Sequence, residues 1–100
     1  AMQRLLGDRL SQVQISATKS MTGHLLGAAG AIEALIAVLA ICRDVIPPTI
    51  NTTQLDPAVP SALNLTLGVK AQRTVNVAMS NSFGFGGHNS TVIFRKPDCQ

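Results

Sequence analysis

The feature that most constrains this 100-residue chain is an apolar run from Leu25 to Cys42 that is interrupted only by Glu33. The run is long enough for a transmembrane helix to be considered. However, an acidic side chain at the centre of a bilayer costs about 2.5–3.5 kcal/mol. Glycine and alanine also fill five of the seven positions after Leu26, so the run is weakly apolar at its start. We therefore expect a buried helix of a soluble protein and no membrane span.

We expect this helix to extend from about His24 to Arg43, with Thr22 as a plausible N-cap. Small residues recur along it at spacings of three and four, which leaves one face without side-chain bulk. Each glycine destabilises a helix by about 0.8–1.0 kcal/mol relative to alanine, so a steric reason for them is expected. The pattern predicts a helix packed flat on a sheet and buried on most sides. The small residues are Gly23, Gly27, Gly30, Ala31 and Ala34.

The rest of the chain predicts mainly short strands, because apolar residues alternate with polar ones in several places. Pro47-Pro48 stops the helix and extends the chain. Few strands and one long helix give an α/β arrangement that is incomplete as a stand-alone domain. The expected elements are the end of an amphipathic helix over Ala1–Leu10, strands at Gln12–Ala17, Thr49–Asn51, Thr74–Ser80 and Ser90–Phe94, a surface loop over Asn51–Lys70 and a connection at Phe83–Asn89.

Composition narrows the class of protein. Only 13% of the residues are charged, against about a quarter in a typical soluble domain, so we expect the rest of a longer polypeptide or a partner subunit to cover much of the surface. The net charge is +3, but the basic residues form no run and Tyr and Trp are absent, which argues against nucleic-acid binding. No signal peptide is expected, because no basic segment followed by an apolar core opens the chain.

The two cysteines predict neither a disulfide framework nor a metal site. Cys42 lies in the apolar run and reads as a small, inert, buried residue, while Cys99 is one residue from the end. This usage fits a reducing compartment.

Lys19 and His24 lie in a polar loop directly before the apolar run. At a helix start, the helix dipole would favour the neutral imidazole, which can donate a hydrogen bond to a developing oxyanion. Lys19 would hold a carboxylate or lower the pKa of a neighbouring group. The alternatives are a structural histidine that bonds a neighbouring carbonyl and a solvated surface lysine.

A second candidate site is the segment Gly84-Phe85-Gly86-Gly87. Its glycines allow the backbone to approach a ligand closely, and Phe85 offers a bulky side chain that could plug a tunnel. It is not a phosphate loop, because it joins two strands and no Lys-Ser/Thr follows. The alternative is an ordinary glycine-rich hairpin turn, and His88 beside it reads as a structural residue.

Three ordered motifs resemble the C-terminal end of an elongating β-ketoacyl-acyl carrier protein synthase, and the resemblance covers residues 11–96. It implies that residues 1–100 are the C-terminal segment of a thiolase-like fold, with a buried helix on a mixed sheet. It also implies decarboxylative Claisen condensation of malonyl-acyl carrier protein with an acyl thioester, without a cofactor or metal. The motifs are Ser16–Glu33, Pro47–Asn51 and Asn81–Asn89.

The resemblance also implies site roles. His24 resembles the second histidine of a Cys-His-His triad, Lys19 the lysine that orders the site, and Glu33 the buried acid linked to it. Phe85 resembles the gate of the acyl pocket and an oxyanion-hole amide, within the gate loop of Gly84, Gly86 and Gly87. Asn89 matches the asparagine that closes the motif.

The implied partners are acyl carrier protein with phosphopantetheine-linked acyl and malonyl groups, the remainder of the synthase, and a second copy in a homodimer. The implied location is the cytoplasm, or an organelle stroma or matrix. The nucleophilic cysteine and the first histidine of the triad have no match here, so this chain alone is expected to be inactive. A polyketide ketosynthase domain and a non-catalytic chain-length partner subunit are the alternatives, and the intact Lys19, His24 and Phe85 argue against the latter.

Overall fold

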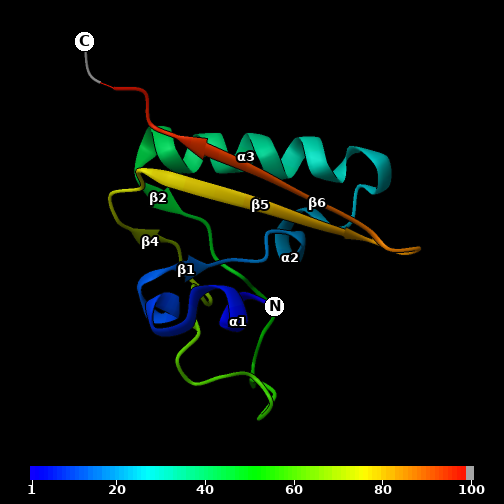
Figure 1. Ribbon diagram of the computed structural model, residues 1–100, viewed down its shortest axis with the longest axis vertical. Coiled ribbons are helices and arrows are strands. Elements are labelled where there is room, and N and C mark those ends of the chain that lie inside the picture. Colours follow the sequence, from blue (N-terminus) through cyan, green and yellow to red (C-terminus); the bar gives the residue numbers. More distant parts are fainter. Residues whose placement is uncertain (99–100) are drawn as a thin grey trace. The chain divides into compact units, whose positions relative to one another are not determined.

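The computed structural model describes residues 1–98, so the expectation for Cys99 lies outside the described part. The chain forms two compact units, coloured along the sequence in Figure 1. One unit contains Ala1–Gly23 and Ile46–Ala71. The other contains His24–Val45 and the segment from Gln72 onward. Two short strands lie where the chain passes from one unit to the other, β2 (Val45–Ile46) and β4 (Ala71–Gln72).

The first unit consists of short elements. Helix α1 (Met2–Leu6) leads into the 3₁₀ helix η1 (Gly7–Gln12), and strand β1 (Gln14–Ile15) pairs in parallel with β3 (Asn64–Leu65). The one-turn helix α2 (Lys19–Thr22) follows β1. The predicted helix over Ala1–Leu10 is shorter than expected because Gly7 adopts φ 53° and ends α1. Leu10 is nevertheless the deepest apolar side chain of the described residues, at 2% exposure.

The second unit is a long helix beside a hairpin (Figure 1). A 3₁₀ turn, η2 (Leu26–Ala28), precedes helix α3 (Ala29–Arg43). Strands β5 (Val77–Gly84) and β6 (His88–Arg95) pair antiparallel, from Val77 opposite Arg95 to Gly84 opposite His88. Both predicted strands are therefore present, and they extend further toward the turn than expected, but β5 begins at Val77 and not at Thr74.

Asp44 ties the end of α3 to the start of the hairpin. It adopts the left-handed conformation, and its backbone N–H donates to the Ala40 carbonyl at the end of the helix. Its Oδ1 accepts hydrogen bonds from the Val75 N–H at 2.9 Å and from Lys96 Nζ at 2.6 Å. The hydrogen bond from Lys96, followed by the one from Val75, lowers the pKa of Asp44 below its ordinary value of 3.8. At the other end of α3, a Cβ on Gly30 would lie 4.0 Å from Ser82 Oγ, so α3 runs antiparallel to β5.

Several expectations about the long helix are wrong in detail. It begins at Ala29 after a 3₁₀ turn, not at His24, and Thr22 is the last residue of α2 rather than an N-cap.

Among the described residues, nothing lies within 4 Å of where a Cβ on Gly27 would be, so the steric reason expected for this glycine is not found within this chain. Cys42, which was expected to be buried, is exposed, whereas its neighbour Ile41 is buried. Thr49 forms only an isolated parallel bridge with Leu67, so the predicted strand at Thr49–Asn51 is absent from the described fold.

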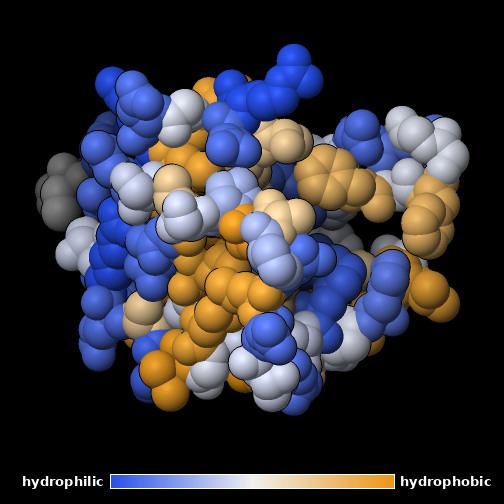
Figure 2. Space-filling model, turned by 90° about the horizontal axis from the view of Figure 1, so that it is seen from below, coloured by the Kyte–Doolittle hydropathy of each residue, from blue (hydrophilic) through white to orange (hydrophobic). Residues whose placement is uncertain are grey.

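The helix is far less buried within this chain than predicted. Ala29 and Ile41 are buried, whereas Leu35 and Leu39 are 54% and 41% exposed. Large apolar side chains are exposed on other elements as well, and on the face seen in Figure 2 hydrophobic side chains gather between polar ones. Among the described residues, Leu26–Arg43 is the one helical stretch long and apolar enough to cross a membrane, a test that a core helix of a soluble protein also passes. So large an exposed apolar area is typical of a surface made for contact.

Candidate active site

Lys19 opens the one-turn helix α2 and is exposed. Gly23 ends this helix with φ 73°, and its N–H donates to the Lys19 carbonyl at 2.9 Å. The positive φ explains why glycine follows Thr22, since a side chain would be strained there. This sharp stop separates α2 from the residues that follow, so Lys19 and His24 lie on two different local structures.

His24 is an exposed residue between α2 and η2. Its Nδ1 accepts a hydrogen bond from the Leu26 N–H at 2.9 Å. A ring nitrogen that accepts a hydrogen bond carries no proton, so in the neutral ring the proton is on Nε2. The hydrogen-bond partner of His24 is thus an N–H group, whereas the alternative of a structural histidine assumed a carbonyl partner. The arrangement leaves Nε2–H as a donor directed away from the backbone contact.

The reason for this ring orientation is local. Leu26 adopts φ 51°, a left-handed conformation that is unusual for a leucine, and its N–H points back to the imidazole. Helix-dipole effects fade within the first turn, and α3 begins only at Ala29. The backbone at Leu26 therefore accounts for the acceptor role of Nδ1, and His24 does not lie at the start of α3 as the dipole argument assumed.

The gate loop is the turn of the β5–β6 hairpin. Gly84 pairs with His88, and the three residues between them include Gly86 at φ 97° and Gly87 at φ 89°, conformations that favour glycine. The Phe85 side chain is fully exposed within this chain, at 108%. Phe85, the side chain predicted to act as a plug, therefore lies on a turn with open space around it.

Asn89 and Glu33 lie on the two elements that carry this turn. Asn89 is the second residue of β6 and pairs with Phe83, so its position along the hairpin is fixed by the strand ladder. Glu33 lies in the second turn of α3 and is partly buried, less than the resemblance implied. Because Gly30 lies near Ser82, the first turns of α3 and the turn end of the hairpin meet at the same end of this unit.

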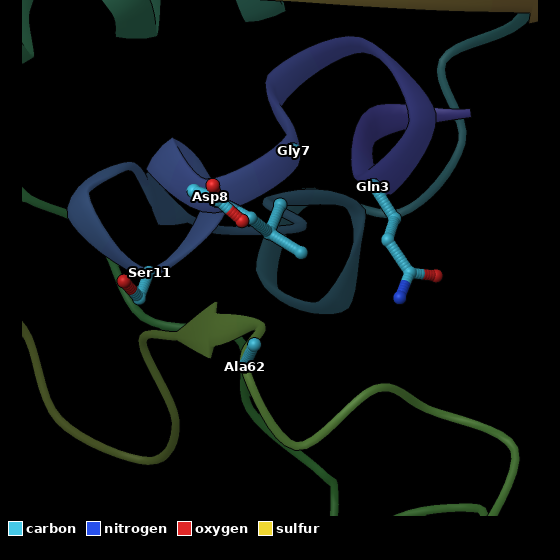
Figure 3. Close-up of a pocket in the computed structure, with 6 residues that line it drawn as sticks. Gln3, Gly7, Asp8, Ser11 and Ala62 are labelled. Atoms are coloured by element: carbon cyan, nitrogen blue, oxygen red, sulfur yellow. The ribbon is translucent and has the colours of Figure 1, made fainter.

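Two pockets of the described residues are formed by other side chains than these. Figure 3 shows one of them in the first unit, an open space of about 450 Å³ that is lined by polar and apolar residues, among them Gln3, Asp8 and Ser11. Another, of about 370 Å³, lies at the start of the hairpin beside Asn76 and Arg95. None of the predicted site residues lines either of these two pockets.

Sequence reasoning missed the residues that hold the Lys19 loop in place. Ser20 and Asn51 join the first motif to the Pro47–Asn51 motif through their side chains. Asp44, which anchors α3, was also missed. A signal was available for Asn51, because asparagine is the non-glycine residue that best tolerates a left-handed conformation, and its φ is 66°.

Comparison with known proteins agrees with the three motifs. Residues 1–53 match the family described as Beta-ketoacyl synthase, C-terminal domain. The chain belongs to the β-ketoacyl synthase family. It is 49% identical over 96 residues to 3-oxoacyl-[acyl-carrier-protein] synthase 2 of Rhizobium meliloti, and 49% identical over 96 residues to the synthase 2 of Synechocystis. It is 46% identical over 96 residues to synthase 1 of Haemophilus influenzae.

These alignments cover 96% of this chain but only 22–23% of the relatives, so the chain spans less than a quarter of their length. A solved structure described as a type II PKS acyl-carrier protein in complex with its ketosynthase bound to the hexaketide is also similar. The match has a TM-score of 0.89 at 33% identity and covers 97% of this chain and 23% of that one. The α/β arrangement is therefore part of a thiolase-like fold, as the sequence predicted.

Proposed function

We propose that this chain is the C-terminal segment of a 3-oxoacyl-acyl carrier protein synthase that elongates fatty acids by decarboxylative condensation. The observation that carries the proposal is the 49% identity over 96 residues to synthases of that name. The geometry at His24 supports it, because the reaction needs a hydrogen-bond donor where negative charge develops. We refer below to the complete enzyme as the full-length synthase.

In this proposal, His24 acts on the malonyl group. Cleavage of the bond to the carboxylate releases carbon dioxide and leaves an electron pair that develops as an enolate oxyanion. The Nε2–H of His24 donates to that oxygen, while the Leu26 N–H keeps the ring in the correct tautomer. The enolate carbon then attacks the acyl thioester, and the cysteine thiolate leaves.

The other site residues take supporting roles. Lys19 orders the site together with Glu33, and Asn89 holds the base of the gate loop. Phe85 closes the acyl pocket, and its amide is one donor of the oxyanion hole. The open glycine backbone at Gly86 and Gly87 lets this turn move without side-chain clashes.

The nucleophilic cysteine and the first histidine belong to the remainder of the synthase in this proposal. Cys42 lies on the last turn of α3, outside the motifs that carry the site, and Cys99 lies beyond the described residues. The remainder also covers the exposed face of α3, which makes α3 a core helix. We further propose a homodimer that receives its substrates from acyl carrier protein, in the cytoplasm or in an organelle stroma or matrix.

A chimera tests the proposal. The matching segment of the Rhizobium meliloti synthase is replaced by this chain, and formation of 3-oxoacyl product is measured with acyl- and malonyl-acyl carrier protein. The proposal expects an active chimera and no product from the 100-residue chain alone. A well-folded chimera that forms no product would contradict it, as would product formation by the chain alone.

A ketosynthase of a polyketide pathway is the second candidate, favoured by the structural match to a type II PKS complex. The two differ in the fate of the product. A full-length synthase that extends saturated acyl chains but does not extend unreduced 3-oxoacyl chains supports the fatty-acid assignment. Repeated extension of an unreduced 3-oxoacyl chain would support the polyketide one.

A further inference from the structure

The Pro47–Asn51 motif is held against the loop that carries Lys19 by hydrogen bonds that all involve a side chain. The Ser16 hydroxyl donates to the Pro47 carbonyl at 2.6 Å, and the Ala17 N–H donates to Thr49 Oγ1 at 2.8 Å. The Ile50 N–H donates to Ser20 Oγ at 2.9 Å, and Asn51 Nδ2 donates to the Ser20 carbonyl at 3.3 Å. We call these contacts between residues 16–20 and 47–51 the Ser20–Asn51 clasp.

The reason for side-chain bonds lies in the sequence of the second segment. Pro47 and Pro48 have no N–H group, so they cannot donate to a strand ladder with the first segment. Hydroxyl and amide side chains replace the missing backbone donors and acceptors. The backbone groups of Thr49 are used elsewhere, since its N–H donates to the Thr66 carbonyl and its carbonyl accepts from the Gly68 N–H.

Ser20 is the centre of the clasp. Its hydroxyl donates to the Ala17 carbonyl at 2.9 Å while it accepts from the Ile50 N–H, and its own carbonyl accepts from Asn51. Ser20 directly follows Lys19 in α2, a helix of four residues. Helices this short are not stable on their own, so α2 depends on such outside contacts for its conformation.

Asn51 combines two properties that few residues share. Its φ of 66° lies in the left-handed region, which asparagine tolerates better than other non-glycine residues. Its amide also supplies the donor to the Ser20 carbonyl. Glycine would keep the backbone conformation without the donor, which provides a way to separate the two roles.

We infer that Ser20 and Asn51 are positioning residues for the condensation reaction, acting through Lys19. This inference rests on the proposed function, in which Lys19 orders the site for decarboxylation. The clasp touches no reacting atom. It fixes the turn of α2 from which the Lys19 side chain projects, and loss of the clasp displaces the ammonium group.

The test uses the full-length synthase or the chimera, with the variants Ser20→Ala, Ser20→Thr and Asn51→Gly. Ser61→Ala is the matched control, because Ser61 is an exposed serine of the same unit. Decarboxylation of malonyl-acyl carrier protein and acylation of the cysteine are measured separately, well below the melting temperature of each variant. Lys19→Ala and His24→Ala are measured alongside.

Displacement of a positioned group by about 1 Å can lower a rate by up to about 100-fold. We therefore expect Ser20→Ala and Asn51→Gly to lower kcat of decarboxylation by about 10-fold to 100-fold. KM and cysteine acylation should stay near wild type. Ser20→Thr, which keeps the hydroxyl, should recover most of the loss, and Ser61→Ala should behave as wild type.

Two results overturn the inference. One is an unchanged rate of decarboxylation in Ser20→Ala and Asn51→Gly. The other is a loss of stability in these variants together with equal losses in decarboxylation and in cysteine acylation, which indicates a purely structural role. If Lys19→Ala and His24→Ala abolish decarboxylation in the same experiment, the proposed function stands and only the clasp role fails. If those two variants are also active, the proposed function itself fails.

Discussion

The β5–β6 hairpin and the loops of the Ser20–Asn51 clasp are held by different kinds of hydrogen bond. The hairpin uses a continuous backbone ladder from Val77–Arg95 to Gly84–His88, so its conformation depends little on which side chains it carries. The clasp depends on the side chains of Ser16, Ser20, Thr49 and Asn51. Substitutions in the hairpin should therefore change packing and substrate fit, whereas substitutions in the loops should change chemistry.

The largest expected effect is that of His24→Ala in the full-length synthase. Loss of one oxyanion donor typically lowers kcat by about 10²–10³, or 2.7–4 kcal/mol. We expect decarboxylation to fall by this factor, while transfer of the acyl chain to the cysteine suffers less, as measured by single-turnover assays of each half-reaction. The matched control is His88→Ala, at the hairpin end of the same chain, which should stay near wild type. Equal effects of the two substitutions would remove the distinction between the loops and the hairpin.

A second prediction concerns the two faces of α3. Ile41 is 5% exposed and Leu35 is 54% exposed in this chain. Truncation of a buried Ile or Leu to alanine costs about 2–5 kcal/mol. We expect both Ile41→Ala and Leu35→Ala to destabilise the full-length synthase on this scale, as measured by denaturant unfolding. If Leu35→Ala hardly changed the free energy of unfolding of that protein, the exposed face of α3 would not be covered there.

The third prediction concerns the turn of the hairpin. Phe85→Ala should broaden the acyl-chain preference, because the bulky side chain that limits the pocket is removed, and should lower decarboxylation less than His24→Ala does. The measurement is product formation across a series of acyl chain lengths. Phe83→Ala is the control, since Phe83 lies in β5 and is 69% exposed within this chain. An unchanged chain-length profile in Phe85→Ala would contradict the gate assignment.

The smallest expected effect is the pH dependence of the Asp44 anchor. Because Lys96 and the Val75 N–H lower the pKa of Asp44 in the folded state, its contribution to stability is fully present above the unfolded value of 3.8. That contribution is lost as the pH falls through the lower folded pKa. Asp44→Asn keeps a residue that tolerates the left-handed conformation and removes only the charge.

We therefore expect Asp44→Asn to reduce stability modestly near neutral pH, with a difference from wild type that shrinks below pH 3.8. Unfolding curves of the full-length synthase at several pH values measure it. Lys96→Met should give a similar small loss at neutral pH. A stability difference that stays constant as the pH falls would argue against a charge effect.

The sequence by itself determined the class of fold and supplied the candidate site residues, whose roles stay predictions. Alternating apolar residues predicted both strands of the hairpin, and glycines predicted its turn, because these signals are local and the backbone responds to them directly. The long helix was predicted for the same reason. The choice of Lys19, His24 and Phe85 as candidate site residues came from three motifs in order along the chain. The family relationship confirms that the chain belongs to the β-ketoacyl synthases.

Tertiary structure decided what holds the loops, and local backbone geometry that the apolar pattern does not reveal decided where the helix begins and how His24 is oriented. A periodic apolar pattern cannot show that Leu26 adopts φ 51° and turns its N–H toward the imidazole, which delays α3 to Ala29. Nor can it show that Ser20 and Asn51 meet, since 31 residues separate them and their contact depends on the path of the whole chain between them. Backbone periodicity is encoded locally, whereas side-chain hydrogen bonds between distant segments form only when the fold brings them together.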